Sequence, residues 1–157
     1  MPFEHLTTSQ GVSVETFQSL RAGTGWGVPE AEACRTAIDN SLLSLTAYAG
    51  TAPVGMVRVV GDGVLNAYVQ DLIVEEDCRG KGVGRHLMDA ALANLAESCP
   101  SSLSIGLVSA HGMDGFYEAL GFRSRPNDVE GAGFQSQLGE LLTTSERHAL
   151  AKPGRAE

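Results

Sequence analysis

The spacing of apolar and polar residues predicts two short helices near the start of the chain. Ser13 is a suitable cap for a helix that runs to about Ala22. A glycine-rich loop, AGTGWGVP, follows it and holds the only tryptophan, Trp26. Pro29 suits the first turn of a second helix. The apolar face of that helix is formed by Cys34, Ala37, Ile38 and Leu42.

Three strands are predicted next, as a β-meander. The first two are LSLTAYAG and PVGMVRVVG, joined by a turn at Gly50–Pro53 and followed by a turn at residues 61–63. In the third strand, AYVQDLIVE, Asp71 shares a face with Val69 and Ile73, so neither face is cleanly apolar. A bulge near Asp71 or Leu72 would reset the phase, and bulges often re-aim groups beside active sites.

The rest of the chain predicts a long helix, a strand and a short helix. Residues 82–98 carry an apolar stripe at helical spacing, and residues 103–107 alternate with period two. The segment GMDGFYEAL reads as a short helix, and Gly121 suits its carboxyl end before another strand that begins near Phe122. We expect irregular structure and strand over residues 123–136.

Length and composition indicate one globular domain. The chain has 157 residues, of which 43% are apolar and 19% charged. We expect a single domain over residues 1–157 with a core at about 3–137, and a helix or frayed tail over 138–157. The sequence shows no apolar run long enough to span a membrane and no signal peptide, so a cytoplasmic protein without a membrane partner is expected.

The net charge and the cysteine spacing argue against a nucleic-acid partner, a disulfide framework and a metal site. A net charge of -8 argues against nucleic acid, because phosphate-backbone binding relies on clustered Lys and Arg. Cys34, Cys78 and Cys99 have no paired metal-ligand spacing, so neither a disulfide framework nor a metal site is indicated. Cys78 lies beside Arg79 before a helix start, yet a thiol without an assigned base is more often a bystander.

The segment CRGKGVGR, between the third strand and the long helix, concentrates positive charge in this acidic chain. Glycines let backbone N–H groups converge on an anion at a helix amino terminus, where the helix dipole also favours negative charge. A plain glycine-rich connection with solvated charges is the alternative interpretation. The spacing fits neither a Walker loop nor the G-x-G-x-x-G dinucleotide fingerprint.

The pattern Arg79-x-x-Gly82-x-Gly84 directly after a strand resembles the GNAT superfamily of acyl-CoA-dependent N-acyltransferases. A second hallmark, FYEALGF at residues 116–122, lies at the expected distance. The resemblance covers about residues 53–125 well, and residues 13–52 only by the order of elements. It implies an α/β (α+β) fold with a mixed, mostly antiparallel central sheet flanked by helices, in which a bulged strand precedes the coenzyme-binding turn and helix.

The same resemblance implies the coenzyme site. In this family the turn holds the coenzyme A pyrophosphate, and the bulged strand offers backbone N–H groups to the thioester and the pantetheine arm. The residues implied for the coenzyme are Leu72, Ile73, Val74, Arg79, Gly80, Lys81, Gly82, Val83, Gly84 and Arg85. Tyr117 matches the tyrosine that protonates the departing thiolate; a packed aromatic residue on an amphipathic helix is the alternative.

The group that takes the amine proton is less well defined. Tyr68, Gln70 and Asp71 lie where family members often place it, and Asp71 is the only carboxylate among them. Asp71 is equally well interpreted as a hydrogen-bonded structural residue in a strand. Glu30, Glu75 or a chain of water molecules are further alternatives.

By the same analogy, Trp26 and the segment DVEGAGF at residues 128–134 would face the acceptor. There Asp128 or Glu130 and an aromatic wall would favour a cationic amine. Core packing is the alternative interpretation of Trp26. With Trp26, the residues we assign to the acceptor are Tyr68 and Gln70.

The expected activity is transfer of an acetyl group from acetyl-CoA, as co-substrate and without a metal, to a primary amine by direct attack in a ternary complex. A small-molecule acceptor is favoured, and a protein or peptide amino group is the first alternative. A non-catalytic acyl-CoA-binding module is an alternative of another class, because VSAHGMDGF lacks the asparagine that many relatives carry there. Dimers are common in the family, so a homodimer is also an expectation.

Overall fold

A computed structural model of the chain describes residues 5–138. The chain forms two compact units that divide after Val108. The expectation of one domain stays a prediction. The helix or tail expected over residues 138–157 lies almost entirely outside the described residues. No helix in the described part of the chain is long and apolar enough to cross a membrane.

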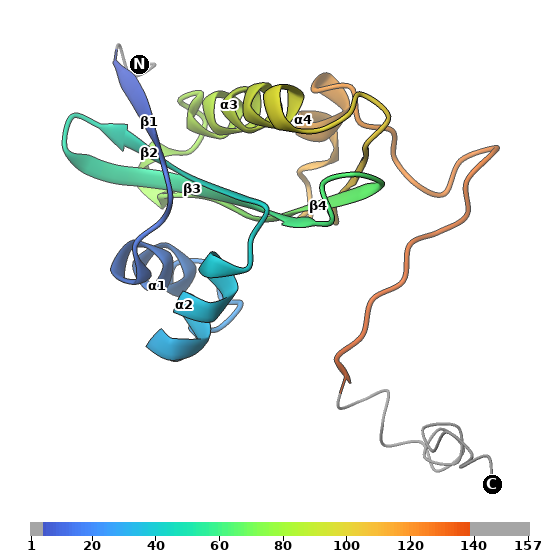
Figure 1. Ribbon diagram of the computed structural model, residues 1–157. Coiled ribbons are helices and arrows are strands. Elements are labelled where there is room, and N and C mark those ends of the chain that lie inside the picture. The colour runs from blue at the N-terminus through green and yellow to red at the C-terminus, as the bar shows by residue number, and fades with distance from the viewer. Residues whose placement is uncertain (1–4, 139–157) are drawn as a thin grey trace, which may run out of the picture. The chain divides into compact units, whose positions relative to one another are not determined.

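The first unit is built on a five-stranded sheet in the order β1-β2-β3-β4-β5 (Figure 1). The strands are β1 (Leu6–Gln10), β2 (Leu43–Ala49), β3 (Ala52–Gly61), β4 (Asn66–Val74) and β5 (Ser104–Gly106). The pairs β1–β2, β2–β3 and β3–β4 are antiparallel, whereas β5 is parallel to β4. The predicted mixed, mostly antiparallel sheet is confirmed, including all three strands of the meander.

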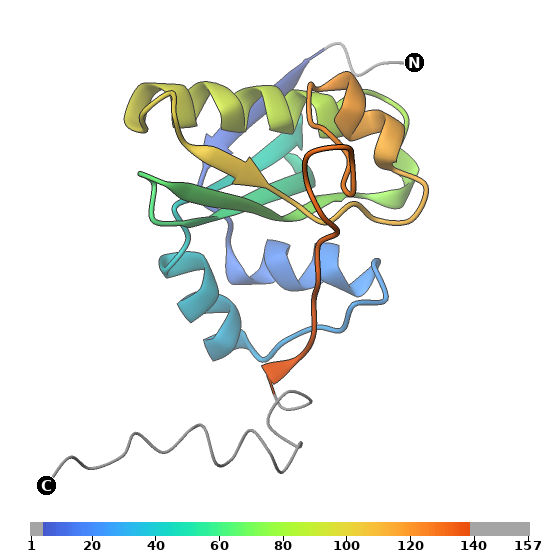
Figure 2. The same cartoon turned by 90° about the vertical axis from the view of Figure 1, so that its right-hand side faces the viewer.

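Three α-helices cover this sheet. Helices α1 (Val14–Ala22) and α2 (Ala31–Asp39) lie against one face, and α3 (Val83–Ser98) lies against the other (Figures 1 and 2). The hydroxyl of Ser13 accepts a hydrogen bond from the Thr16 amide, so the predicted cap of α1 is confirmed. The core under α1 and α2 is formed by Val12, Phe17, Leu20, Cys34, Met56 and Ile73.

Gly55 in β3 sets how closely α3 approaches the sheet. A Cβ at this position would lie 2.9 Å from the Ile73 carbonyl oxygen, 3.1 Å from Leu87 Cδ1 and 3.2 Å from Val83 Cγ1. The two α3 side chains therefore pack directly over the β3 backbone. Any larger residue at this position would push the amino-terminal half of α3 away from the sheet.

Strand β1 is not predicted by the apolar pattern. Its sequence, LTTSQ, has a single apolar residue and no alternation. It forms because it is an edge strand, which pairs with β2 from Leu6↔Ala49 to Gln10↔Leu45. Backbone hydrogen bonds stabilise such a strand without requiring an apolar face.

The second unit contains α4 (Asp114–Ala119), and Gly121 ends this helix with φ +95°, as predicted. The strand expected near Phe122 is absent from the described residues, so that prediction is wrong for this part of the chain. The chain instead folds back on itself. The Asn127 amide donates to the Glu130 carbonyl, and the Asn127 side chain accepts from the amides of Val129 and Glu130.

Candidate coenzyme and acceptor site

A β-bulge lies in β4 where the sequence predicts one. Between the Met56↔Ile73 and Arg58↔Gln70 pairs, β4 carries one residue more than β3. Asp71 occupies the bulge with φ +46°, in the left-handed region that aspartate tolerates better than most residues. The bulge is thus confirmed in register and in backbone conformation.

Strand β4 extends beyond its pairing with β5. Strand β5 pairs with β4 only from Asn66 to Tyr68, and β4 continues to Val74. From Leu72 to Val74 that edge has no strand partner among the described residues. The side chain of Ile73 is buried, so the contribution of this stretch to a ligand comes from its backbone. Such fixed N–H groups suit an extended amide-containing arm or a developing oxyanion.

The glycine turn after β4 has the backbone of an anion cradle. Gly80 has φ +72° and Gly82 has φ +89°, and no atom lies within 4 Å of a Cβ built on either residue. The first intrahelical bond of α3 runs from the His86 amide to the Gly82 carbonyl. The amides of residues 83–85 precede it and stay outside the helical ladder. The turn therefore fits a phosphate group at the start of α3.

The cations of the turn differ in their surroundings. Arg79 Nε donates to the Val74 carbonyl at 3.1 Å, which ties the turn to the end of β4. Arg85 pairs with Asp89 one helical turn later, and both side chains are more than half exposed. Lys81 is half-buried in the turn itself. Val83 is buried under β3, so only its backbone remains for a ligand.

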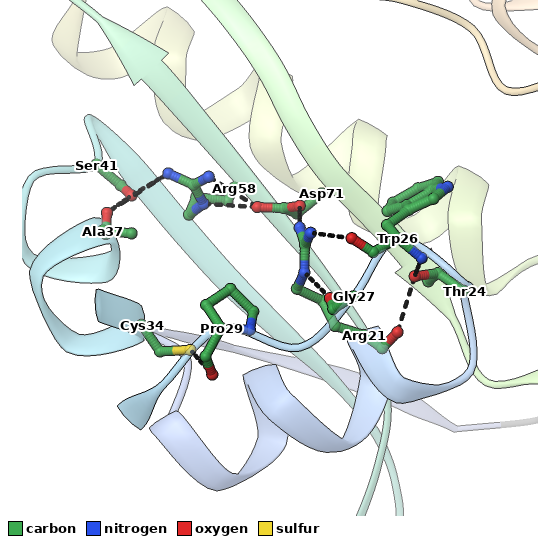
Figure 3. Close-up of polar contacts among 10 residues, drawn as sticks. All are labelled: Arg21, Thr24, Trp26, Gly27, Pro29, Cys34, Ala37, Ser41, Arg58 and Asp71. Atoms are coloured by element: carbon green, nitrogen blue, oxygen red, sulfur yellow. Dashed lines mark hydrogen bonds and ion pairs between the residues drawn. The ribbon is translucent and has the colours of Figure 1, made fainter. Parts of the chain in front are cut away.

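Asp71 is the centre of a buried ion-pair cluster (Figure 3). Its side chain is fully buried, and each carboxylate oxygen is bound by a different arginine. Arg21 Nη1 lies 2.6 Å from Oδ1, whereas Nε and Nη2 of Arg58 both lie 2.8 Å from Oδ2. A carboxylate held in this way has no free oxygen for an amine proton. These contacts favour the structural interpretation of Asp71 over the general base.

Arg21 and Arg58 were not among the residues singled out from the sequence. A signal for Arg58 was present, because it is a lone cation in the apolar strand PVGMVRVVG, one hairpin away from a lone carboxylate in β4. Buried charges need partners, so two isolated opposite charges on neighbouring strands indicate a pair. Arg21 lies at the end of α1, and no periodicity identifies its partner.

Trp26 lies in the loop between α1 and α2 and is 51% exposed. It is therefore a surface residue, and the core-packing interpretation is not supported. The guanidinium of Arg21 lies 5.9 Å from the centre of the Trp26 ring.

The other two proposed acceptor residues, Gln70 and Tyr68, lie in β4, where Gln70 is half-buried. Burial raises the pKa of the Tyr68 hydroxyl, and a hydrogen bond with the Val108 backbone partly offsets this effect.

Two of the clefts in the described part of the first unit are lined by residues discussed above, Arg58 in one and Tyr68 in the other. One, of about 600 Å³, lies between α2 and β3 and is lined by Glu32, Ala33, Thr36, Ala37, Asn40, Arg58 and Val60. The other, of about 300 Å³, lies where β4 pairs with β5 and includes Tyr68 in its lining. Trp26 and Gln70 line neither of these two clefts.

Among the described residues, no group of three or more His, Cys, Asp or Glu side chains is arranged to hold a metal ion.

In the second unit, Tyr117 lies on α4 between two aromatic rings. Phe116 and Phe122 make edge-to-face contacts with it, at centroid distances of 5.0 and 6.1 Å. Burial raises the pKa of the Tyr117 hydroxyl, which keeps this group protonated at neutral pH. Protonation is the state that a general acid requires.

Glu130, predicted to be near the acceptor, is bound within its own turn. The Asn127 side-chain amide donates to its carboxylate at 2.9 Å. This hydrogen bond, with the nearby Arg123 and Arg125, lowers the pKa of Glu130. Asp128 lies in the same exposed turn.

Comparison with known proteins relates nearly all of this architecture to one family. The profile of the family described as Acetyltransferase (GNAT) domain matches residues 9–137. The serotonin N-acetyltransferase 2, chloroplastic, of Oryza sativa subsp. japonica is 33% identical over 143 residues, which are 88% of this chain and 70% of that protein. The GCN5-related N-acetyltransferase 1, chloroplastic, of Arabidopsis thaliana is 28% identical over 129 residues, which are 81% of this chain and 64% of that protein.

A solved structure gives the same result. The GNAT family acetyltransferase of Streptococcus pneumoniae TIGR4 superposes with a TM-score of 0.69 and is 30% identical. The superposition covers 85% of this chain and 99% of that protein. The chain thus has the fold of a GNAT acetyltransferase, and its bulged strand and glycine turn lie within the residues that the family profile matches.

Proposed function

Because this chain belongs to the GNAT acetyltransferase family and is an acyl-CoA-dependent enzyme, we propose that it transfers the acetyl group of acetyl-CoA to a primary amine by direct attack in a ternary complex. The observation that carries the proposal is the glycine turn at the start of α3, directly after the bulged β4. Two left-handed glycines with open space above them suit the coenzyme diphosphate.

The residues proposed to bind the coenzyme lie along one continuous stretch of chain. Backbone N–H groups of residues 72–74 bind the pantetheine arm and polarise the thioester carbonyl. The amides of residues 80–85 bind the diphosphate, with charge from Arg79, Lys81 and Arg85. Acetyl-CoA is the co-substrate of GNAT acetyltransferases and supplies an activated acetyl group as a thioester.

The chemistry assigned to the chain is positioning and proton transfer. The amine nitrogen forms the new N–C bond, and the C–S bond of the thioester breaks. Tyr117 donates its proton to the departing thiolate, in line with its raised pKa. Asp71 is engaged by two arginines, so we assign the amine proton to water, with Glu30 or Glu75 as the remaining carboxylate candidates.

For the acceptor we propose a small-molecule amine that presents an aromatic group. The exposed ring of Trp26 offers a stacking surface. The rice relative is named a serotonin N-acetyltransferase, which makes serotonin a sensible first member of an amine panel. Protein and peptide amino groups form the alternative class and belong in the same panel.

We keep the cytoplasm as the proposed compartment, although both plant relatives are named chloroplastic proteins.

The test combines binding with turnover. Calorimetry should detect coenzyme A binding to the purified chain, and release of free thiol should follow acetyl-CoA consumption with the amine panel. Binding without turnover of any amine would contradict acetyl transfer to a primary amine. The absence of any binding by a folded protein would remove the proposed site.

Gly82→Ala and Gly50→Ala form a matched pair for this test. Gly50 has φ +63° in the β2–β3 turn and, like Gly82, open space at a built Cβ. Both substitutions therefore introduce similar backbone strain. Only Gly82→Ala should weaken coenzyme A binding.

A further inference from the structure

Arg21 makes two side-chain hydrogen bonds to the loop between α1 and α2, residues 23–30. Arg21 Nε donates to the Gly27 carbonyl at 3.1 Å, and Arg21 Nη2 donates to the Trp26 carbonyl at 3.4 Å. Thr24 adds a link, because its hydroxyl donates to the Arg21 carbonyl and accepts from the Trp26 amide. The guanidinium plane thus orders the part of the loop that displays Trp26 (Figure 3).

The third guanidinium nitrogen connects this loop to the sheet. Arg21 Nη1 binds the Asp71 carboxylate at 2.6 Å, and Arg58 holds the other carboxylate oxygen from β3. Arg21 and Arg58 side chains are only 16% and 13% exposed, so these charge-assisted bonds are shielded from water. Figure 3 shows Asp71 between the two guanidinium groups, with the Trp26 loop beyond Arg21.

Asp71 is also the residue that makes the bulge. Its backbone φ lies in the left-handed region, and residues 72–74 of β4 follow it directly. A displacement of the bulge therefore moves the carboxylate that Arg21 binds. A displacement of the loop likewise pulls on the same carboxylate.

We propose that Arg21 and Asp71 are positioning residues that hold the Trp26 loop in a fixed relation to the bulged strand. Arg58 acts as the support that keeps the Asp71 carboxylate turned toward Arg21. In acetyl transfer, a role that rests on the proposed function, this contact aligns the acceptor surface with the strand that binds the coenzyme. The mechanical link between loop and strand does not depend on that function.

Trp26 is the only tryptophan of the chain, so its fluorescence reports on this loop alone. The experiment measures time-resolved anisotropy and acrylamide quenching of the full chain and of three single variants. Arg21→Gln leaves Asp71 paired with Arg58, so no carboxylate is left buried without a partner. Asp71→Asn removes the negative charge of the link from the strand side. Arg35→Gln is the control, because Arg35 pairs only loosely with Glu32 at 3.7 Å on the exposed face of α2.

We expect Arg21→Gln and Asp71→Asn to lower the anisotropy of Trp26 and to increase its quenching, while Arg35→Gln changes neither. The double variant Arg21→Gln/Asp71→Asn should lose no more anisotropy than Arg21→Gln alone, because Arg21→Gln already breaks the Arg21–Asp71 link that Asp71→Asn removes. Arg21→Lys, which keeps the charge but loses the planar fork, should restore only part of the anisotropy.

The proposal is overturned if Asp71→Asn folds and leaves Trp26 as rigid as in the wild type, since the strand would then have no part in holding the loop. Should Asp71→Asn fail to fold, Asp71→Asn/Arg58→Gln removes one buried cation together with the carboxylate and takes its place under the same criterion. Unchanged anisotropy in Arg21→Gln is equally contradictory.

A second readout applies once an amine is turned over. Arg21→Gln should raise the KM for the amine by roughly tenfold with a much smaller change in kcat, as expected for loss of the charge-assisted hydrogen bonds that position a binding surface. If no amine is turned over, the proposed function fails, while the fluorescence result still decides the link between loop and strand.

Discussion

Arg21 and Asp71, which are 50 positions apart in the chain, are joined by a buried ion pair of 2.6 Å. The pair connects the end of α1 to the bulge of β4. Its carboxylate is shared with Arg58, so the three side chains form one network with a single negative and two positive charges. Networks of this kind are destabilised most when the shared member is removed.

We therefore predict an order of stability among the variants of this network. Asp71→Asn should lower the free energy of unfolding by about 3 kcal/mol, because two poorly exposed guanidinium groups lose their counter-charge. Arg21→Gln should cost about 1–2 kcal/mol, since a neutral Asp71–Arg58 pair remains. Urea denaturation measures both values. A larger loss in Arg21→Gln than in Asp71→Asn would contradict the shared-carboxylate arrangement.

The glycines of the coenzyme turn should separate stability from binding. Gly82→Ala places a Cβ at φ +89° and should cost about 1–2 kcal/mol of stability as well as coenzyme affinity. Gly84 lies inside α3, where alanine is favoured over glycine by about 1 kcal/mol. Gly84→Ala should thus preserve or raise the melting temperature while weakening coenzyme A binding. Thermal denaturation and calorimetry on the same samples test this; unchanged affinity in Gly84→Ala would exclude its backbone from the cradle.

Tyr117→Phe should reduce kcat by roughly 100- to 1,000-fold with little change in the KM for acetyl-CoA, because it removes only the proton donor. Burial raises the pKa of the Tyr117 hydroxyl from its ordinary 10.0. The wild-type enzyme should accordingly keep its protonated acid past the pH at which a free tyrosine ionises. Tyr48→Phe, in β2, is the matched control. Equal kcat in Tyr117→Phe and the wild type would remove the general-acid role.

Asp62 should make the β3–β4 turn sensitive to acid. Its carboxylate accepts hydrogen bonds from the amides of Asn66, Val64 and Leu65, and these bonds lower its pKa from 3.8. A carboxyl whose pKa is lower in the folded than in the unfolded state stabilises the fold at a pH above its unfolded-state pKa. This stabilisation is lost as the pH falls through the pKa of the folded state. The urea midpoints of wild type and Asp62→Ala should therefore differ at pH 6 and converge in acid. A difference that persists unchanged at pH 2 would contradict this linkage.

Much of the first unit follows from local patterns in the sequence. The Ser13 cap, the meander and the stripe of the long helix each have a short-range signal, and all are present in the structure. The bulge could be inferred because Asp71 disturbs an otherwise apolar strand, and a disturbed alternation indicates a change of register. The glycine turn was recognisable because its backbone conformation depends on its own residues.

The partners of Asp71 required tertiary structure. Local patterning shows that a buried carboxylate needs a cation, but not which of eleven Lys and Arg residues meets it. For this reason the base and structural interpretations of Asp71 were equally acceptable from the sequence. The strand expected near Phe122 failed for a related reason, because the hydrogen bonds around Asn127 close a local turn that an apolar pattern does not reveal.

The tight contact at Gly55 couples β3 to the proposed coenzyme turn. Val83 and Leu87 rest on the bare backbone there, and Val83 is the first residue after the glycine turn. The distance between the sheet and the proposed phosphate cradle thus depends on the absence of a side chain at position 55. A larger residue at position 55 would press on Ile73 and Val83, which both belong to the proposed coenzyme site, although residue 55 itself is not part of that site.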